Sequence, residues 1–142
     1  MAISQSIANS FKTELLTGTH NFTASTGDTF KLALYLSSAT LNSSTTAYTA
    51  SGETSGTGYS AGGNTLTSVT PVLSSSTAIC DFADTSWLTA SITARGALLY
   101  NSSKSNKAVA VFDFGSDRIS TSSTFQITFP TPDSSNAVIR IT

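Results

Sequence analysis

The stretch ASITARGALLYNSSKSNKAVAVFDFG, residues 90–115, decides the fold of this chain. It holds two apolar runs, residues 92–100 and 108–114, joined by the polar link 101–107. Successive side chains of a strand point to opposite faces, and both faces of each run carry apolar residues. Strands with two apolar faces are typical of the middle of a packed structure. We therefore expect a central β-hairpin.

Shorter alternating segments flank this hairpin and indicate the fold class. They span residues 29–37, 65–73, 77–83, 118–120, 125–129 and 137–141, with a turn expected at Ser116 and Asp117. About seven or eight short strands at this spacing favour a mainly β protein, an antiparallel β-sandwich or jelly-roll-like domain. A length of 142 residues fits one such domain, spanning 1–142. The pattern predicts a core that includes Trp87, Leu98, Val109, Val111, Phe112, Ile127 and Phe129.

One N-terminal α-helix is expected over residues 3–17. Four apolar residues recur there at every fourth position and form one stripe: Ile3, Ile7, Phe11 and Leu15. Ser4 is the expected N-cap, and Gly18 is well placed to end the helix. The stripe can pack on the sandwich of its own chain, which we expect, or it can dock on a neighbouring protein.

Residues 38–63 are almost entirely Ser, Thr, Gly and Ala, with Leu41, Tyr48, Glu53 and Tyr59 as exceptions. This composition predicts a long loop. A loop of this length in a compact domain usually has a function or a partner. Because it has few apolar residues for a core of its own, we expect contacts from outside the chain to order it.

Charge and cysteine content narrow the possible partners. The formal net charge is −1, charged residues make up 11% of the chain, and Lys and Arg are scattered. Nucleic-acid binders normally show a basic patch and membrane spans need about 18 apolar residues, so we expect neither partner. The one cysteine, Cys80, cannot form a disulfide within the chain and is expected to be buried and unreactive. Without the features of a secretion signal at the N-terminus, assembly in a cytoplasm is expected.

The titratable residues match no catalytic or metal-binding motif. The one histidine, His20, follows the predicted helix and is expected to be a turn residue or a cap for the last carbonyls. A calcium-loop pattern of alternating Asp and Asn is missing around the candidate acids Asp81, Asp84, Asp113 and Asp117. We therefore expect no enzyme activity, no catalytic residue, no cofactor and no metal site.

Several blocks of the sequence, taken together and in their order along the chain, resemble those of a known protein family. They are SFKTELLTGTHNF (10–22), DTFKLALYLSSATL (28–41), GTGYSAGGNTL (56–66), ITARGALLYN (92–101), KAVAVFDFG (107–115) and the ending AVIRIT. Together, over nearly the whole chain, they resemble a family of small structural proteins encoded by tailed bacteriophages, including phages of cyanobacteria.

The resemblance implies a non-enzymatic virion protein assembled in the cytoplasm of a bacterial host. We expect a capsid decoration or cement protein that binds the major capsid protein as a symmetric homo-oligomer, most simply a trimer. A tail, neck or baseplate component is the alternative, and a host-surface glycan-binding module is a third hypothesis. The expected contact residues are Ile3, Ile7, Phe11, Leu15, Tyr48 and Tyr59.

Overall fold

The computed structural model describes residues 2–142 and is mainly β, with 49% strand and 6% helix. Two antiparallel sheets and one short helix near the N-terminus form the β-sandwich that the alternating pattern predicted. Among the described residues, no helix is long and apolar enough to cross a membrane.

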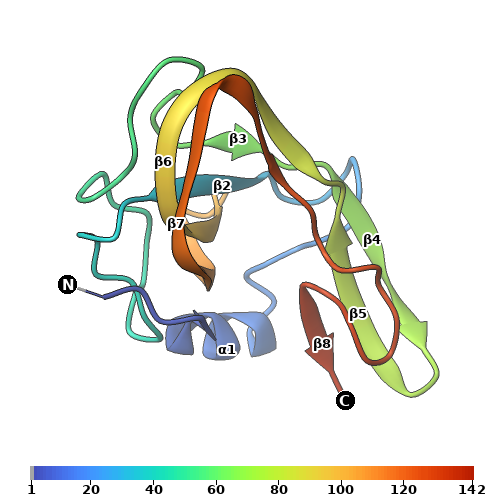
Figure 1. Ribbon diagram of the computed structural model, residues 1–142. Coiled ribbons are helices and arrows are strands. Elements are labelled where there is room, and N and C mark those ends of the chain that lie inside the picture. Colours follow the sequence, from blue (N-terminus) through green and yellow to red (C-terminus); the bar gives the residue numbers. More distant parts are fainter. Residues whose placement is uncertain (1) are drawn as a thin grey trace.

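The two sheets differ in size and position (Figure 1). The larger sheet has the order β1 (Ser6–Ile7), β7 (Lys107–Ile127), β6 (Thr85–Asn101), β2 (Phe30–Tyr35) and β3 (Asn64–Thr65). The smaller sheet, which we call the arm, consists of β4 (Ser68–Ser74), β5 (Thr77–Phe82) and β8 (Ile139–Ile141). In Figure 1 the arm extends from the side of the molecule opposite the N-terminus.

The β6–β7 hairpin is the centre of the fold, as predicted, but its strands are longer than expected. β7 is a single strand from Lys107 to Ile127, so the predicted turn at Ser116 and Asp117 is wrong. Ala94 pairs with Arg118 and Gly96 with Asp113, which leaves residues 114–117 as a bulge opposite one residue of β6. A bulge bends a strand without ending it. Gly115, at φ +81°, supplies a backbone conformation that other residues rarely adopt.

The bent hairpin forms an arch over the rest of the larger sheet (Figure 1). A further shift of register follows Ala90, and Thr89 and Ser122 both have positive φ near it. These irregularities let the distal halves of β6 and β7 curve away from the sheet floor. We use the name arch for this distal part, residues 85–95 and 114–127.

One continuous core joins the two sheets. Leu98, Val109 and Val111 are fully buried, and the core also contains Trp87 and Phe129, as the pattern predicted. The arm contributes its inner face to this core, the buried residues Cys80, Phe82 and Ile139. The prediction was wrong for Phe112 and Ile127, which are only half-buried. Both line an open groove described below.

The N-terminal helix is shorter than predicted. The helix α1 spans Asn9–Leu16, and the preceding residues Ser6–Ile7 form β1 on the edge of β7. Ser4 therefore does not cap the helix: its N–H donates to the Leu41 carbonyl, and Ala8 holds the N-cap position without a side-chain bond. Pairing with existing strands gives this segment backbone hydrogen bonds that helical periodicity does not reveal. The prediction of a helix from residue 3 was wrong for this reason.

The end of α1 follows the prediction. Gly18 has φ +72°, its N–H donates to the Leu15 carbonyl, and the Thr19 N–H donates to the Glu14 carbonyl. These two bonds form a Schellman motif, in which a left-handed glycine satisfies the last carbonyls of a helix. Gly18 thus ends the helix as expected.

The loop 38–63 is ordered by a carboxylate of its own chain. Glu53 accepts hydrogen bonds from the Tyr48 and Tyr59 hydroxyls and from the Gly62 N–H, each at 2.7 Å. A carboxylate with three donors holds distant parts of the loop together. Sequence reasoning missed this because it counted only apolar residues as possible anchors.

Backbone bonds attach the same loop to the sheet. The Leu36 N–H donates to the Gly52 carbonyl, and the Thr54 N–H donates to the Leu34 carbonyl, both at 2.9 Å. Thr54 is itself buried. The loop therefore has anchors in its own chain, which the sequence analysis did not expect, and its contact with a partner stays a prediction.

Candidate functional site

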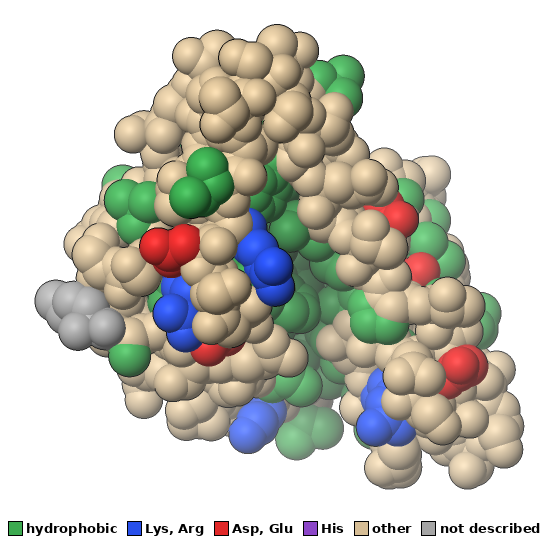
Figure 2. Space-filling view, in the orientation of Figure 1, with side chains coloured by type: hydrophobic (Ala, Val, Ile, Leu, Met, Phe, Trp, Pro, Cys, Tyr) green, Lys and Arg blue, Asp and Glu red, His purple; other side chains and the backbone are tan. Residues whose placement is uncertain are grey.

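The most prominent surface feature is a groove of about 800 Å³ beneath the arch. Figure 2 shows it as a hollow with hydrophobic side chains at its base, between the part of the molecule that carries the arch and the arm. Its apolar lining comes from both halves of β7, from the segment that follows β7 and from the floor: Leu32, Ala97, Phe112, Phe114, Ile119, Phe125, Ile127, Phe129, Pro130 and Val138.

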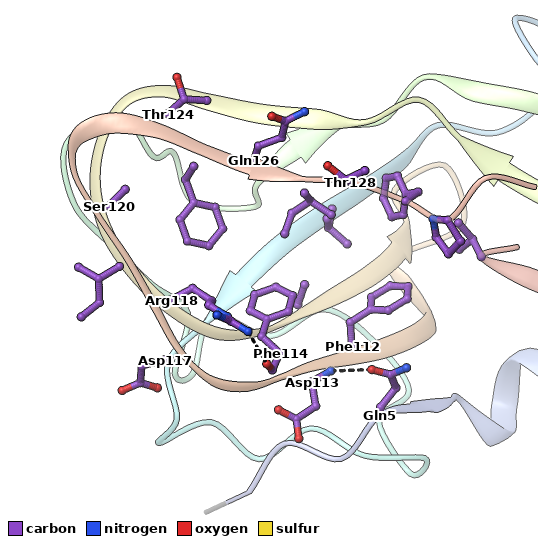
Figure 3. A pocket seen from close by; sticks show the side chains of 18 of the residues that line it. Gln5, Phe112, Asp113, Phe114, Asp117, Arg118, Ser120, Thr124, Gln126 and Thr128 are labelled. Carbon is purple, nitrogen blue, oxygen red and sulfur yellow. Dashed lines mark hydrogen bonds between the residues drawn. The ribbon is translucent and has the colours of Figure 1, made fainter. Parts of the chain in front are cut away.

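The geometry of β7 explains why this groove is open. Phe112 and Phe114 lie before or within the bulge and project into the groove from below (Figure 3). Phe125, Ile127 and Phe129 alternate along the returning part of the chain, so they share the face that lines the groove. The bulge keeps these two apolar surfaces apart except where the rings of Phe112 and Phe129 make an edge-to-face contact, with their centroids 6.5 Å apart.

One cation faces the groove. The Arg118 guanidinium points inward, and its Nη2 donates to the Phe114 carbonyl at 3.4 Å (Figure 3). Among residues 2–142, no carboxylate lies within ion-pair distance of Arg118. The groove therefore combines apolar side chains with polar ones such as Gln5, Ser123 and Gln126, and it holds one positive charge that has no carboxylate of residues 2–142 within ion-pair distance.

The acids nearest the groove are turned away from it. Asp113 and Asp117 point to the outside of β7 in Figure 3. Asp113 Oδ1 is 2.9 Å from Arg95 Nε and also accepts the Gly115 N–H. The hydrogen bond from Arg95 lowers the pKa of Asp113, assisted by the bond from Gly115. This ion pair stabilises the bulge and leaves Arg118 without an acidic partner.

His20 is part of a buried polar network, which corrects the expectation of a turn or capping residue. Its side chain is fully buried, with Nε2 3.0 Å from Glu14 Oε1 and Nδ1 3.0 Å from Asn101 Nδ2. The same amide nitrogen donates to Asp28 Oδ2 at 2.8 Å. Since an amide nitrogen can only donate, Nδ1 is the acceptor and Nε2–H donates to Glu14. The rings of Phe11 and Phe22 pack beside the imidazole.

The carboxylates of this network are held ionised. Burial raises the pKa of Glu14, but hydrogen bonds from His20 and Lys107 outweigh it, and the net shift is downward. For Asp28, burial is likewise outweighed by hydrogen bonds from Asn101 and the Asn21 N–H, which lower its pKa. The network therefore fixes the helix to the β6–β7 turn, and no residue of it lines the groove.

The remaining reactive groups are also enclosed. Cys80 is buried, as expected, and burial raises the pKa of its thiol to about 12. In the part of the chain from residue 2 to 142, no three His, Cys, Asp or Glu side chains gather as metal ligands would.

The six predicted contact residues lie away from the groove. Ile3 and Phe11 are buried in the core, and Ile7 and Leu15 pack against it, so the stripe faces its own sandwich. Tyr48 and Tyr59 pack against the core too, and their hydroxyls bind Glu53. Sequence reasoning missed the groove, although the alternating segment 125–129 was one signal for its upper wall.

Comparison of the chain with protein-family models, curated proteins and solved structures found no match. The resemblance to a family of phage structural proteins therefore stays a prediction.

Proposed function

We propose that this protein is a non-enzymatic structural component of a tailed-phage virion, a decoration protein that binds the major capsid lattice. The observation that carries this proposal is a pair of unpartnered apolar surfaces on one small domain, the groove and the arm. Large apolar surfaces on a small protein mark sites of protein contact, because their exposure to water is unfavourable. The family resemblance supplies the particle in which those contacts form.

The apolar surface of the arm is concentrated on two strands. Leu73 on β4 is 73% exposed and Ile141 on β8 is 54% exposed. Both pair with Ala78 of β5, so they share one face at the free end of the arm. It is the same face of the arm that packs into the core through Cys80, Phe82 and Ile139. At the free end of the arm this face extends past the core. Such an extension is available to a neighbouring protein.

The positions of the polar groups also favour a binding role. His20, Glu14 and Asp28 are engaged in the buried network, while Glu53 holds the loop 38–63. The groove offers aromatic side chains and one guanidinium, together with uncharged polar side chains such as Gln126 and Thr128. This composition resembles the centre of a protein interface, where aromatic residues and Arg are enriched.

Co-sedimentation with capsids tests the proposal. Capsids assembled from the major capsid protein of the same phage are mixed with the purified protein, and the copies bound per particle are counted by band densitometry. We expect saturable binding of hundreds of copies per capsid. A Leu73→Asp variant should bind at least about tenfold more weakly, because a buried charge opposes an apolar contact.

Leu16→Asp is the matched control for this experiment. Leu16 is 89% exposed at the end of α1 and belongs neither to the groove nor to a strand of the arm, so the same charge there should leave binding unchanged. Failure of the wild-type protein to bind capsids would contradict the decoration proposal. About six or twelve copies in purified virions would instead indicate a tail, neck or baseplate component.

A further inference from the structure

The arch has a free strand edge at the rim of the groove. β7 pairs with β6 on one edge, and on its other edge β1 covers only Ala110 and Val111. From residue 112 to 127, no other strand and no backbone hydrogen bond of residues 2–142 reaches this second edge. Residues 119–127 contain neither proline nor a charged side chain. Natural proteins usually cover, charge or interrupt such an edge, because its unpaired N–H and C=O groups can bind a further strand.

The hydrogen bonds of β6 identify the backbone groups of β7 that face this free edge. In an antiparallel pair, residues that bond to each other alternate with residues whose backbone groups point away. The carbonyls of Thr93 and Ser86 on β6 accept hydrogen bonds from side chains of the loop 38–63 and of β3, so both point away from β7. Their partners on β7 are Ile119 and Gln126. The N–H and C=O groups of Ile119 and Gln126 therefore point to the free edge.

The groove lies beside the same segment of β7. Phe125 and Ile127 flank Gln126 in the sequence and line the groove. A strand added at this edge would continue the sheet, so every second side chain of it would enter the groove beside Phe125 and Ile127. Arg118 points into the groove before this segment and has no carboxylate of residues 2–142 within ion-pair distance (Figure 3). The edge thus combines backbone hydrogen bonds, apolar contacts and one positive charge.

An extended polypeptide is the ligand that matches this combination. Successive N–H and C=O groups along a strand edge are satisfied by the backbone of another extended chain, while pockets for alternate side chains give selectivity. The same edge already binds one extended segment, since Ser6 and Ile7 of β1 pair with Val111 and Ala110. A partner strand would occupy the part of the edge that β1 leaves free.

The charge at this edge favours a different protein over a second copy. Two copies that paired symmetrically through this edge would keep the same face of each strand on the same side of the joined sheet. Both Arg118 side chains would then lie on the groove side, whereas Asp117 points to the outside of β7 (Figure 3). A segment that carries an acidic side chain provides the complementary charge instead.

We propose that an extended segment of the major capsid protein binds as an added strand along residues 119–127 of β7, with apolar side chains in the groove and a carboxylate at Arg118. This inference rests on the proposed function and names the kind of segment that fills the groove.

Amide hydrogen exchange of the capsid-bound protein tests the added strand directly. The N–H groups of Ile119 and Gln126 should exchange at least about tenfold more slowly in the complex than in the free protein, because each gains a backbone acceptor. The N–H groups of Phe125 and Ile127 face β6 by the same alternation, so their exchange should change little.

Two pairs of variants test the backbone and the charge separately. Gln126→Pro removes an N–H that faces the free edge and should weaken capsid binding by about tenfold, whereas Gln126→Thr keeps the N–H and should bind like wild type. Arg118→Glu should also weaken binding by about tenfold. Its control is Lys12→Glu, the same change of charge at an exposed position of α1, which should leave binding unchanged. Circular dichroism confirms that each variant is folded.

The outcomes separate this inference from the proposed function. Capsid binding without slower exchange at Ile119 and Gln126, or with full binding by Gln126→Pro, would overturn the added strand and leave the decoration proposal standing. A wild-type protein that does not bind capsids would contradict both. A dimer in solution whose edge amides exchange slowly without capsids would assign the edge to a second copy and overturn the inference.

Discussion

At the scale of single residues, Asn101 illustrates how a polar side chain can determine packing. It is fully buried, and its amide contacts His20, Asp28 and the Ser103 N–H. These partners come from segments far apart in the sequence. One side chain therefore connects the N-terminal segment to the turn of the central hairpin.

Asn101→Ala should lower the free energy of unfolding markedly. It leaves the polar atoms of His20 and Asp28 buried without their partner, at a cost of about 1–3 kcal/mol for each group. Urea unfolding followed by circular dichroism measures the loss. Lys104→Ala is the control, since its ammonium is half-exposed and 3.8 Å from Asp28, and it should cost less than about 1 kcal/mol. Equal losses in both variants would contradict this reading of the network.

The tyrosines around Glu53 predict a loss of stability in alkaline solution. Burial and the Glu53 carboxylate raise the pKa of Tyr48 and of Tyr100 to about 12, from an ordinary value of 10.0. The same causes raise the pKa of Tyr35 and Tyr59. Because the raised pKa favours the neutral phenol in the folded state, this stability is complete below pH 10 and declines between about pH 10 and pH 12.

Urea unfolding at about pH 8 and about pH 11 measures this decline. Tyr48→Phe removes one of the titrating groups and should reduce the difference between the two conditions. A Tyr48→Phe protein with the same pH dependence as wild type would show that Tyr48 does not contribute to it.

At the scale of elements, the amphipathic stripe of α1 serves folding. Phe11 is 2% exposed and packs with its ring centroid 4.9 Å from His20 and 6.0 Å from Phe22. The helix is too short to be stable by itself, so this packing holds it in place.

Phe11→Ala should destabilise the protein by about 3–5 kcal/mol, the usual cost of removing a buried phenyl ring. Leu16→Ala, at the exposed end of the same helix, should change stability by less than about 0.5 kcal/mol. Chemical denaturation of the isolated protein measures both. A Phe11→Ala protein as stable as wild type would show that the stripe faces a partner instead.

The loop 38–63 should likewise be needed for folding. Deletion of residues 49–57 removes Glu53 and Thr54, and with them the anchors of Tyr48, Tyr59 and Gly62. The expected result is a lower melting temperature of the isolated protein, measured by circular dichroism. A deletion variant that melts like wild type but no longer binds capsids would restore the original expectation that outside contacts hold this loop.

At the scale of the whole molecule, one core spans both sheets. Phe82 and Ile139 of the arm belong to the same buried cluster as Leu98 and Val109 of the larger sheet. Sheets that share a core are expected to unfold together. The arm is thus part of the domain, although its free end extends beyond the core.

Unfolding should therefore be a single cooperative transition. Trp87 is the one tryptophan, it is buried in the larger sheet, and its fluorescence reports on that sheet. Its urea transition should coincide with the transition of far-UV circular dichroism, which reports on all strands. Two separate transitions would show that the arm unfolds independently.

The sequence by itself determined the fold class, the central hairpin and most of the core. Alternation over residues 92–100 and 108–114 is a local property, and it places Leu98, Val109 and Val111 inside whatever the strands pair with. The end of α1 at Gly18 is also determined by the local sequence, because a glycine in the left-handed conformation ends a helix without contacts from distant residues.

Only the tertiary structure decided the start of the helix, the role of His20 and the groove. Each depends on partners remote in sequence: β1 pairs with β7, and His20 meets Asn101 across 81 positions. The groove lies where a bulge at 114–117 turns β7 back, so that Phe112 and Phe114 line one side of the space and Phe125 and Ile127 line the other. An alternating apolar pattern predicts which face of a strand a side chain occupies. It does not predict how far that face lies from the apolar surface that it faces in the folded protein.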